Sequence, residues 1–215
     1  MEAMRVDHVS FAAEHDGVHA TAARIGKLLG VTPVDGGVHP RFGTRNVILP
    51  LEHTLYVEVV ECLDHPASDK APFGQAVRAR SEAGGGWLGW VIRVNDIAEI
   101  EARLGRKAAD GNRKRPDGVE LRWKQIGVKG LQSDPQLPFF VEWETKDAHP
   151  GLGAEDCGVS IETLQIAGDP DRVHEWLGLP ATETSTIIDF SFVAPHGTPG
   201  LMSVTFHTPD GEVTI

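Results

Sequence analysis

Two glutamates occupy positions at which a strand normally carries apolar side chains. Glu58 interrupts the apolar run Leu55–Val60, and Glu142 interrupts the run Phe139–Trp143. Aromatic and β-branched residues suit a pleated, half-buried surface, so both runs predict strands. An ionised carboxylate is costly to bury unless it is paired, protonated or bound to a metal ion. Glu58 and Glu142 are therefore the first candidates for chemistry in this chain.

The two runs also resemble each other, which indicates an internal repeat. The four residues that end at Glu58 align with the four that end at Glu142 at a single offset. Because successive side chains of a strand point to opposite faces, Tyr56 shares a face with Glu58, and Phe140 shares one with Glu142. The opposite faces are purely apolar, and we expect them to pack against helices. Both carboxylates are then expected to face a cleft.

Three roles are open to carboxylates in such a cleft. They can bind a metal ion, one of them can act as a general base with a raised pKa, or they can form an ion-pair network with arginines such as Arg45 or Arg122. Arg45 and Asn46 are in turn candidates for binding a substrate carboxylate or carbonyl, because the guanidinium fork matches a carboxylate. A strand-end arginine that lies in solvent is equally consistent with the pattern.

Aromatic residues and one loop histidine complete the candidate site. Trp90, Trp123 and Trp143 can line a pocket for an apolar or aromatic ligand, although at least two of the three are expected to be ordinary core. His149 precedes Pro150-Gly151, which predicts a turn. A histidine on a loop at the mouth of a cleft can also carry protons. The residues expected to bind a substrate are Arg45, Asn46, Tyr56, Trp90, Trp123, Phe140 and His149.

The elements that position these residues recur in one order. Apolar periodicity predicts strand, helix, strand, strand, strand over residues 5–63, again over 86–146, and a third time over 155–215. A Leu-Gly pair ends the predicted helix in each run, as glycine commonly does. In the second run, Asp110-Gly111 predicts a turn after a short strand over residues 106–109.

Several segments carry a resemblance to a known family. Tandem modules with a histidine near the first strand and a glutamate in each fourth strand resemble the vicinal oxygen chelate superfamily, and in particular its glyoxalase-like domain proteins of the glyoxalase, bleomycin resistance and dioxygenase type. About the first 150 residues carry the motifs, whereas the remainder matches only as a module shape. The segments are Asp7-His8-Val9, Gly43-Thr44-Arg45-Asn46, Tyr56-Val57-Glu58, Pro138 to Glu144 and His149-Pro150-Gly151.

The resemblance implies an α+β fold. Two βαβββ modules, over residues 5–63 and 86–146 within a unit of residues 1–150, pair as a curled mixed sheet around a cleft. A third βαβββ-like module follows over residues 155–215. Two modules suffice to close a cleft, so the third is expected to cover its sheet by packing on the first two or on a second copy of the chain. The second alternative predicts a homodimer.

The resemblance also implies a metal site, because ligands in the superfamily come from the first and fourth strands of each module. The matching positions here are His8, Glu58, Gly89 and Glu142, of which Gly89 cannot bind a metal. His8, Glu58 and Glu142 are then expected to bind a divalent ion, Zn, Ni, Mn or Fe, with positions left open for substrate. Glu58 and Glu142 are also the expected catalytic residues.

Two functions follow from the resemblance. The first is a metal-dependent lyase, isomerase or dioxygenase that acts on a small, vicinally oxygenated substrate. The alternative is a metal-free protein that binds or sequesters a small molecule, as bleomycin resistance proteins do.

Composition narrows the choice of partner and compartment. The 215 residues carry a formal net charge of −11, which argues against nucleic acid and anionic membranes as partners, because both attract positive surface. Two cysteines are too few for a disulfide framework and lack the spacing of a metal site. With no signal peptide and no apolar run long enough to span a membrane, we expect a cytoplasmic protein that binds a small molecule.

Overall fold

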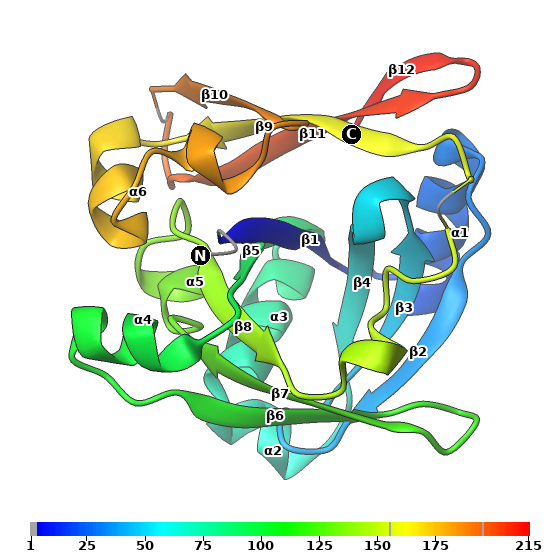
Figure 1. Cartoon of the computed structure of the whole chain (residues 1–215). Helices are drawn as coiled ribbons and strands as arrows, with labels where there is room; N and C mark the ends of the chain where they lie inside the picture. The colour runs from blue at the N-terminus through cyan, green and yellow to red at the C-terminus, as the bar shows by residue number, and fades with distance from the viewer. Residues whose placement is uncertain (1–3, 155, 195) are drawn as a thin grey trace.

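The computed structural model describes residues 4–154, 156–194 and 196–215. Eight strands of these described residues close into a barrel in the order β1-β4-β3-β2-β6-β7-β8-β5 (Figure 1). Within the barrel β1 pairs parallel to β4, and β5 pairs parallel to β8. The strands are β1 (Arg5–Ala12), β2 (Val34–His39), β3 (Thr44–Pro50), β4 (Tyr56–Cys62), β5 (Gly86–Arg93), β6 (Ala109–Lys114), β7 (Glu120–Ile126) and β8 (Phe139–Trp143).

The helices lie outside and at one end of this barrel (Figure 1). The first run has the order β1-α1-β2-β3-β4, and the second has the order β5-α4-β6-β7-β8. Helix α3 packs against β4, β5 and β1 and contributes Phe73, Ala76 and Val77 to the inner apolar cluster. The helices are α1 (Val18–Leu29), α2 (Pro66–Lys70), α3 (Pro72–Glu82), α4 (Ile97–Leu104), α5 (Gly130–Ser133) and α6 (Pro170–Leu177).

Local sequence signals set the ends of these helices. The predicted stops Gly30, Gly105 and Gly178 all adopt the left-handed conformation, with φ of 72°, 61° and 77°. That conformation costs glycine little, and it lets the glycine N–H bond back to a helix carbonyl. Asp96 and Asp169 cap α4 and α6 by accepting backbone N–H groups two residues ahead, both at 2.9 Å.

A second sheet covers one side of the barrel. Its order is β10-β9-β11-β12, with β9 parallel to β10 and antiparallel to β11. The third run therefore repeats the order of elements found in the first two without repeating their strand pairing. Its strands are β9 (Ser160–Ala167), β10 (Asp189–Val193), β11 (Gly200–Thr208) and β12 (Gly211–Thr214).

The second sheet and the barrel share one apolar core. Val6 and Val9 of β1 belong to the same buried cluster as Val204 and Phe206 of β11. The Trp176 indole donates a 2.7 Å hydrogen bond to the Pro138 carbonyl at the start of β8. Of the two packing alternatives, the structure thus shows the one in which the third run packs on the first two. Its predicted first residue, Glu155, lies outside the described residues, and the homodimer stays a prediction.

The predicted turn at Asp110-Gly111 is wrong. Strand β6 runs through both residues, and Gly111 pairs with Trp123 of β7. A Cβ on Gly111 would lie 2.3 Å from the Trp123 indole. Gly111 therefore leaves room for the Trp123 side chain over the strand. A glycine inside a strand can mark such a close approach as well as a turn.

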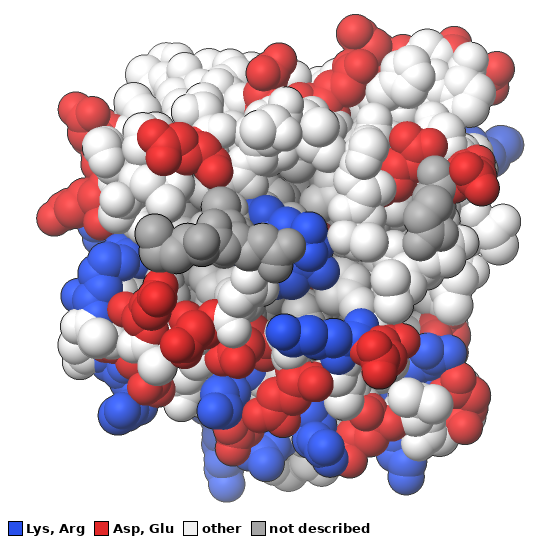
Figure 2. All heavy atoms as spheres, in the orientation of Figure 1, with Lys and Arg blue, Asp and Glu red and all other residues white. Residues whose placement is uncertain are grey.

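Charge is divided unevenly between the two layers. Residues 154–215 contain ten of the 31 acidic residues and one of the 20 Lys and Arg residues. Figure 2 accordingly shows carboxylates over the second sheet and most Lys and Arg over the barrel below it. The acidic surplus of the chain therefore resides mainly outside the barrel.

No helix in the described ranges combines the length and the apolar composition needed to cross a membrane.

Candidate functional site

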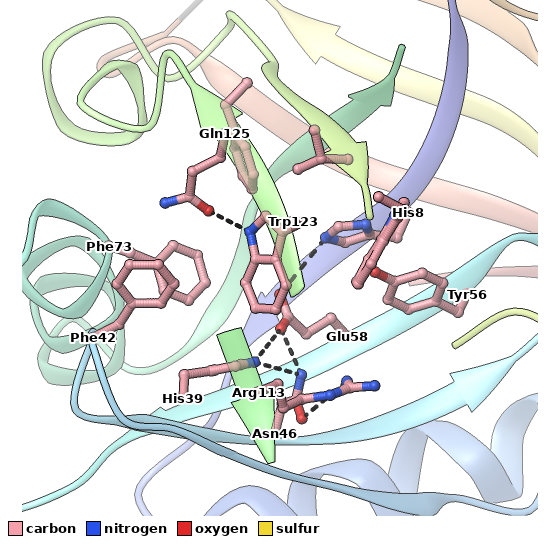
Figure 3. Close-up of a pocket in the computed structure, with 13 residues that line it drawn as sticks. His8, His39, Phe42, Asn46, Tyr56, Glu58, Phe73, Arg113, Trp123 and Gln125 are labelled. Atoms are coloured by element: carbon pink, nitrogen blue, oxygen red, sulfur yellow. Dashed lines mark hydrogen bonds and ion pairs between the residues drawn. The ribbon is translucent and has the colours of Figure 1, made fainter. Parts of the chain in front are cut away.

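A small cavity lies inside the barrel, between its inner walls and α3. The room left among its side chains for water-sized molecules is about 30 Å³. Aromatic rings form most of the wall, and a few polar groups converge on one side of it (Figure 3). The lining residues are His8, His39, Phe42, Asn46, Tyr56, Glu58, Phe73, Arg113, Trp123, Gln125, Phe139, Val141 and Trp143.

Glu58, in the middle of β4, is the carboxylate of this cavity. Its side chain is buried, and each oxygen accepts one hydrogen bond, from Ser10 Oγ at 2.9 Å and from Asn46 Nδ2 at 2.7 Å. Burial alone raises the pKa of the Glu58 carboxyl. The neighbouring imidazoles of His8 and His39, together with the bonds from Asn46 and Ser10, outweigh burial and lower the pKa below its usual value. Glu58 is therefore ionised at neutral pH.

His8 lies beside Glu58 because β1 pairs with β4. Its Nε2 is 3.7 Å from Glu58 Oε2, and its ring stacks on Tyr56 with centroids 4.4 Å apart. Its other nitrogen, Nδ1, lies 2.8 Å from Asp7 Oδ2. A carboxylate only accepts, so this bond places the proton of a neutral ring on Nδ1 and leaves the Nε2 lone pair facing the cavity.

Asp7 anchors His8 from behind the cavity wall. It is fully buried, and its oxygens lie 2.9 Å from His149 Nε2, 3.3 Å from Arg93 Nε and 3.3 Å from Trp143 Nε1. Burial raises the pKa of the Asp7 carboxyl, but hydrogen bonds from His149 and His8 and their charges hold it far below its usual range. Asp7 is thus a fixed negative charge that orients two imidazoles.

Two further polar groups complete the inner surface. The His39 ring bonds Thr44 Oγ1 through Nδ1 at 2.9 Å and points Nε2 at Glu58 Oε1, 3.9 Å away. Burial lowers the pKa of His39 to about 4, so this imidazole is neutral at pH 7. Arg113 Nη1 donates to Asn46 Oδ1 at 3.4 Å, while its buried Nε has no hydrogen-bond partner among the described residues.

The structure brings together six of the sequence-predicted residues at the cavity: His8, Asn46, Tyr56, Glu58, Trp123 and Trp143. The other five do not line it. Arg45 pairs with Glu61 at the half-exposed end of β3, and Trp90 is buried in the core, where its indole donates to the Gln136 carbonyl. Phe140 packs on Trp176 of α6. His149 lies outside the cavity wall, with its Nε2 2.9 Å from Asp7 Oδ1.

The prediction that Glu142 faces the cleft is wrong. Its carboxylate accepts the backbone N–H of Ile97 at 3.0 Å and so lies at the N-terminus of α4, outside the barrel. Phe139, Val141 and Trp143 face the cavity instead. Both faces of β8 are covered, one by α4 and α6 and the other by the aromatic cavity. An apolar face of this strand therefore does not show by itself which side packs against the helices.

The residues present do not fit the expected metal site. With Glu142 outside the barrel, His8 and Glu58 retain no third predicted ligand. Both Glu58 oxygens already accept hydrogen bonds from neutral donors. Across the described part of the chain, no three His, Cys, Asp or Glu side chains are placed to hold one ion.

Sequence reasoning missed His39, Arg113 and Asp7. His39 ends a glycine-rich strand with no apolar alternation, and Arg113 follows the turn wrongly predicted at Asp110-Gly111. A continued strand through Gly111 would have placed Arg113 on the same face as that glycine, since the two are two residues apart. For Asp7, adjacency to His8 was the available signal.

Comparison with known proteins agrees with this architecture. A hypothetical protein from Staphylococcus aureus matches with a TM-score of 0.67 at 16% identity, over 95% of this chain and 90% of its own. At that identity the likeness is one of fold alone. No curated protein matches the sequence.

Looser matches carry no argument about function. Methylmalonyl-CoA epimerase from Mycobacterium tuberculosis gives a TM-score of 0.44 at 16% identity, over 65% of this chain and 86% of its own. A hypothetical protein from Bacillus halodurans gives a TM-score of 0.43 at 13% identity, over 66% of this chain and 94% of its own.

The sequence itself matches the family described as "Glyoxalase-like domain" over residues 6–182, which is most of the chain. The chain belongs to the glyoxalase-like domain family, within the vicinal oxygen chelate superfamily.

Proposed function

We propose that the cavity is the active site of an isomerase-type or lyase-type enzyme that moves a proton on a small oxygenated substrate, with Glu58 and His8 as its acid–base pair. The observation that carries the proposal is the meeting of two proton-accepting atoms in one cavity, His8 Nε2 and Glu58 Oε2, 3.7 Å apart. Asp7 orients His8 through its other ring nitrogen, and Ser10 Oγ orients Glu58 by donating a hydrogen bond to Oε2. A base oriented by a second group is the usual arrangement for proton transfer.

Glu58 supports the role of base. It is ionised at neutral pH, and each of its oxygens has capacity for a further hydrogen bond beyond those from Ser10 and Asn46. Dry aromatic walls strengthen any interaction between this carboxylate and an acidic C–H or O–H group of a bound substrate. Because its pKa is lowered, Glu58 is a weak base that needs no prior deprotonation at neutral pH.

Arg113 supports the role of oxyanion stabiliser. It is buried at 4% exposure, it lines the cavity, and the part of the chain that the structure describes offers its Nε no partner. A buried donor without a partner is costly, and a bound oxygen anion would satisfy it. Such a fixed cation next to a developing enolate oxygen lowers the barrier to its formation.

The chemistry follows from these three roles. Glu58 takes the proton from a carbon next to a carbonyl, and the C–H electron pair moves into an enolate whose oxygen faces Arg113. Protonated Glu58 then returns that proton to the enolate, either directly or after passing it to His8 Nε2. In a lyase reaction the enolate instead expels a leaving group from the β carbon, and the leaving group takes up that proton. No step requires an oxidant or a reductant.

A second candidate is the metal-free binding function. The observation in its favour is the wall of rings from Phe42, Tyr56, Phe73, Trp123, Phe139 and Trp143, which suits an apolar or aromatic ligand without any reaction. In that case Glu58 and Arg113 would fix the ligand's polar end. The two candidates differ in whether a bound compound exchanges protons.

Proton exchange can be measured without knowing the natural substrate. Small hydroxyketones, dicarbonyls and 2-keto acids are incubated with the protein in deuterated buffer, and the loss of their α C–H signals is followed by NMR. We expect exchange with at least one class, reduced at least about a hundredfold in Glu58→Gln, because a positioned base contributes roughly two to four orders of magnitude. His8→Asn should reduce it as well.

Glu142→Gln is the matched control, because it removes a strand carboxylate that lies outside the barrel. Its exchange rate should equal that of the unmodified protein. Exchange that persists in Glu58→Gln, or that falls equally in Glu142→Gln, would contradict the assignment of Glu58. Tight binding of an aromatic compound with no exchange in any class would favour the binding function.

A further inference from the structure

A wider vestibule adjoins the cavity and shares part of its wall. The vestibule offers about 610 Å³ to water-sized molecules, against about 30 Å³ in the inner cavity. Phe42, Phe73 and Gln125 line both spaces. Figure 3 shows Phe42 and Phe73 together on the side of Trp123 away from Tyr56. The partition between the two spaces is therefore made of side chains, which rotate far more readily than backbone moves.

The outer part of the vestibule is positively charged. Arg106, Lys107 and Lys129 line it, and no Asp or Glu is among the described residues that do. The chain as a whole has a net charge of −11. The acidic surplus resides mainly in residues 154–215, so it does not account for cations gathered at this opening.

Two of these cations have no acidic partner in the part of the chain that the structure describes. Lys107 pairs with Glu101 at 3.1 Å, whereas Arg106 and Lys129 form no ion pair within the described residues. Arg106 is nevertheless held in place, since its guanidinium lies 5.7 Å from the centre of the Trp176 ring. A stacked guanidinium keeps its N–H donors free for an anion.

We infer that the vestibule binds the anionic group of the ligand, a phosphate or a carboxylate, while the ligand's apolar part enters the cavity past Phe42, Phe73 and Gln125. The ligand class is thus an amphipathic anion: an aromatic or aliphatic body with its charge at one end. The inference rests on the proposed function only for the inner end of the ligand. The outer end rests on the charge and shape of the vestibule alone.

The test uses two fluorescent probes that differ in one charge. Anilinonaphthalene sulfonate carries an anionic group on an aromatic body, and N-phenylnaphthylamine has the same rings without it. Affinities of both are measured for the unmodified protein, for Arg106→Gln/Lys129→Gln, and for Lys27→Gln/Lys146→Gln. The last variant removes the same charge from exposed sites outside the vestibule.

We expect the vestibule variant to lose about threefold to tenfold in affinity for the sulfonate and to keep its affinity for the neutral probe, because two exposed ion pairs are lost. The control variant should bind both probes as the unmodified protein does. Equal losses in the two double variants would overturn the inference, as would an unchanged sulfonate affinity in the vestibule variant or no sulfonate binding at all. All four substituted residues are exposed, so the variants should fold normally.

Competition then identifies the anionic group. Phenyl phosphate displacing the sulfonate at lower concentration than phenylacetate would assign a phosphate ligand, and the reverse order would assign a carboxylate. Displacement by neither would count against an anion site. Because these readouts need no turnover, a failed proton-exchange assay combined with the expected probe results would refute the proposed function alone.

Discussion

Acidification should unfold this protein in part through His39. The ring is 3% exposed, and burial lowers its pKa from 6.5 to about 4. Above about pH 6.5 the imidazole is neutral in the folded and the unfolded chain. Between about pH 6.5 and pH 4 only the unfolded chain binds the proton, so the free energy of unfolding falls as the pH falls.

The magnitude follows from the shift. One pKa unit corresponds to about 1.4 kcal/mol, so the change from 6.5 to about 4 removes about 3 kcal/mol of stability between neutral pH and about pH 4. That is a large fraction of the roughly 5–15 kcal/mol by which domains are stable. Glu58, Asp7 and His149 also have lowered pKa values and act in the same direction.

A variant isolates the part due to His39. Urea unfolding of the unmodified protein and of His39→Gln is compared at about pH 7, 6, 5 and 4.5. Gln keeps a polar side chain near Thr44 and cannot take up the proton. The variant should be less stable at pH 7 and should lose stability more slowly on acidification, so that the two curves converge.

The exposed substitution His19→Gln serves as the control and should leave the pH dependence unchanged. Parallel curves for the unmodified protein and His39→Gln would refute the reasoning, because they would mean that His39 binds the proton equally well in both states. A His39 ring signal in NMR that titrates above about pH 6 would refute it independently.

Three further outcomes are expected. Gly37 has φ of 100°, and a Cβ there would lie 2.0 Å from the Lys114 carbonyl oxygen, where β2 meets β6. Gly30 also has a positive φ but faces open space, so Gly37→Ala should cost at least about 2 kcal/mol more stability than Gly30→Ala. Equal urea midpoints for the two variants would contradict this. Asp7→Asn removes a buried carboxylate that contacts Arg93 and His149 and should cost about 3 kcal/mol, against almost nothing for the exposed Asp110→Asn; similar losses in both would contradict it. Elemental analysis after incubation with Zn, Ni, Mn and Fe salts should find less than one bound ion per chain, because the predicted ligands His8, Glu58 and Glu142 do not lie around one point; one tightly held equivalent would show that the side chains rearrange around metal.

The sequence alone determined the succession of elements, mostly with small errors at their ends, although β6 was displaced by the false turn at Asp110-Gly111. Periodicity and glycine stops suffice for this, because a helix or strand forms where a local pattern repeats and ends where the backbone must turn. Gly30 and Gly178 illustrate the point, since their left-handed conformation is a property of the residue itself. Family membership also followed, since it depends on local motifs in register with those elements.

Tertiary structure decided which faces of the strands meet. Glu58 and Glu142 have nearly the same neighbours in sequence, yet one lies in the cavity and the other caps α4. The alternation of a strand fixes which side chains share a face but not which face turns inward, and β8 is covered on both. Likewise, Arg113 reaches Asn46 only because the barrel closes between β2 and β6. Contacts of that kind join residues far apart in sequence, so no local pattern contains them.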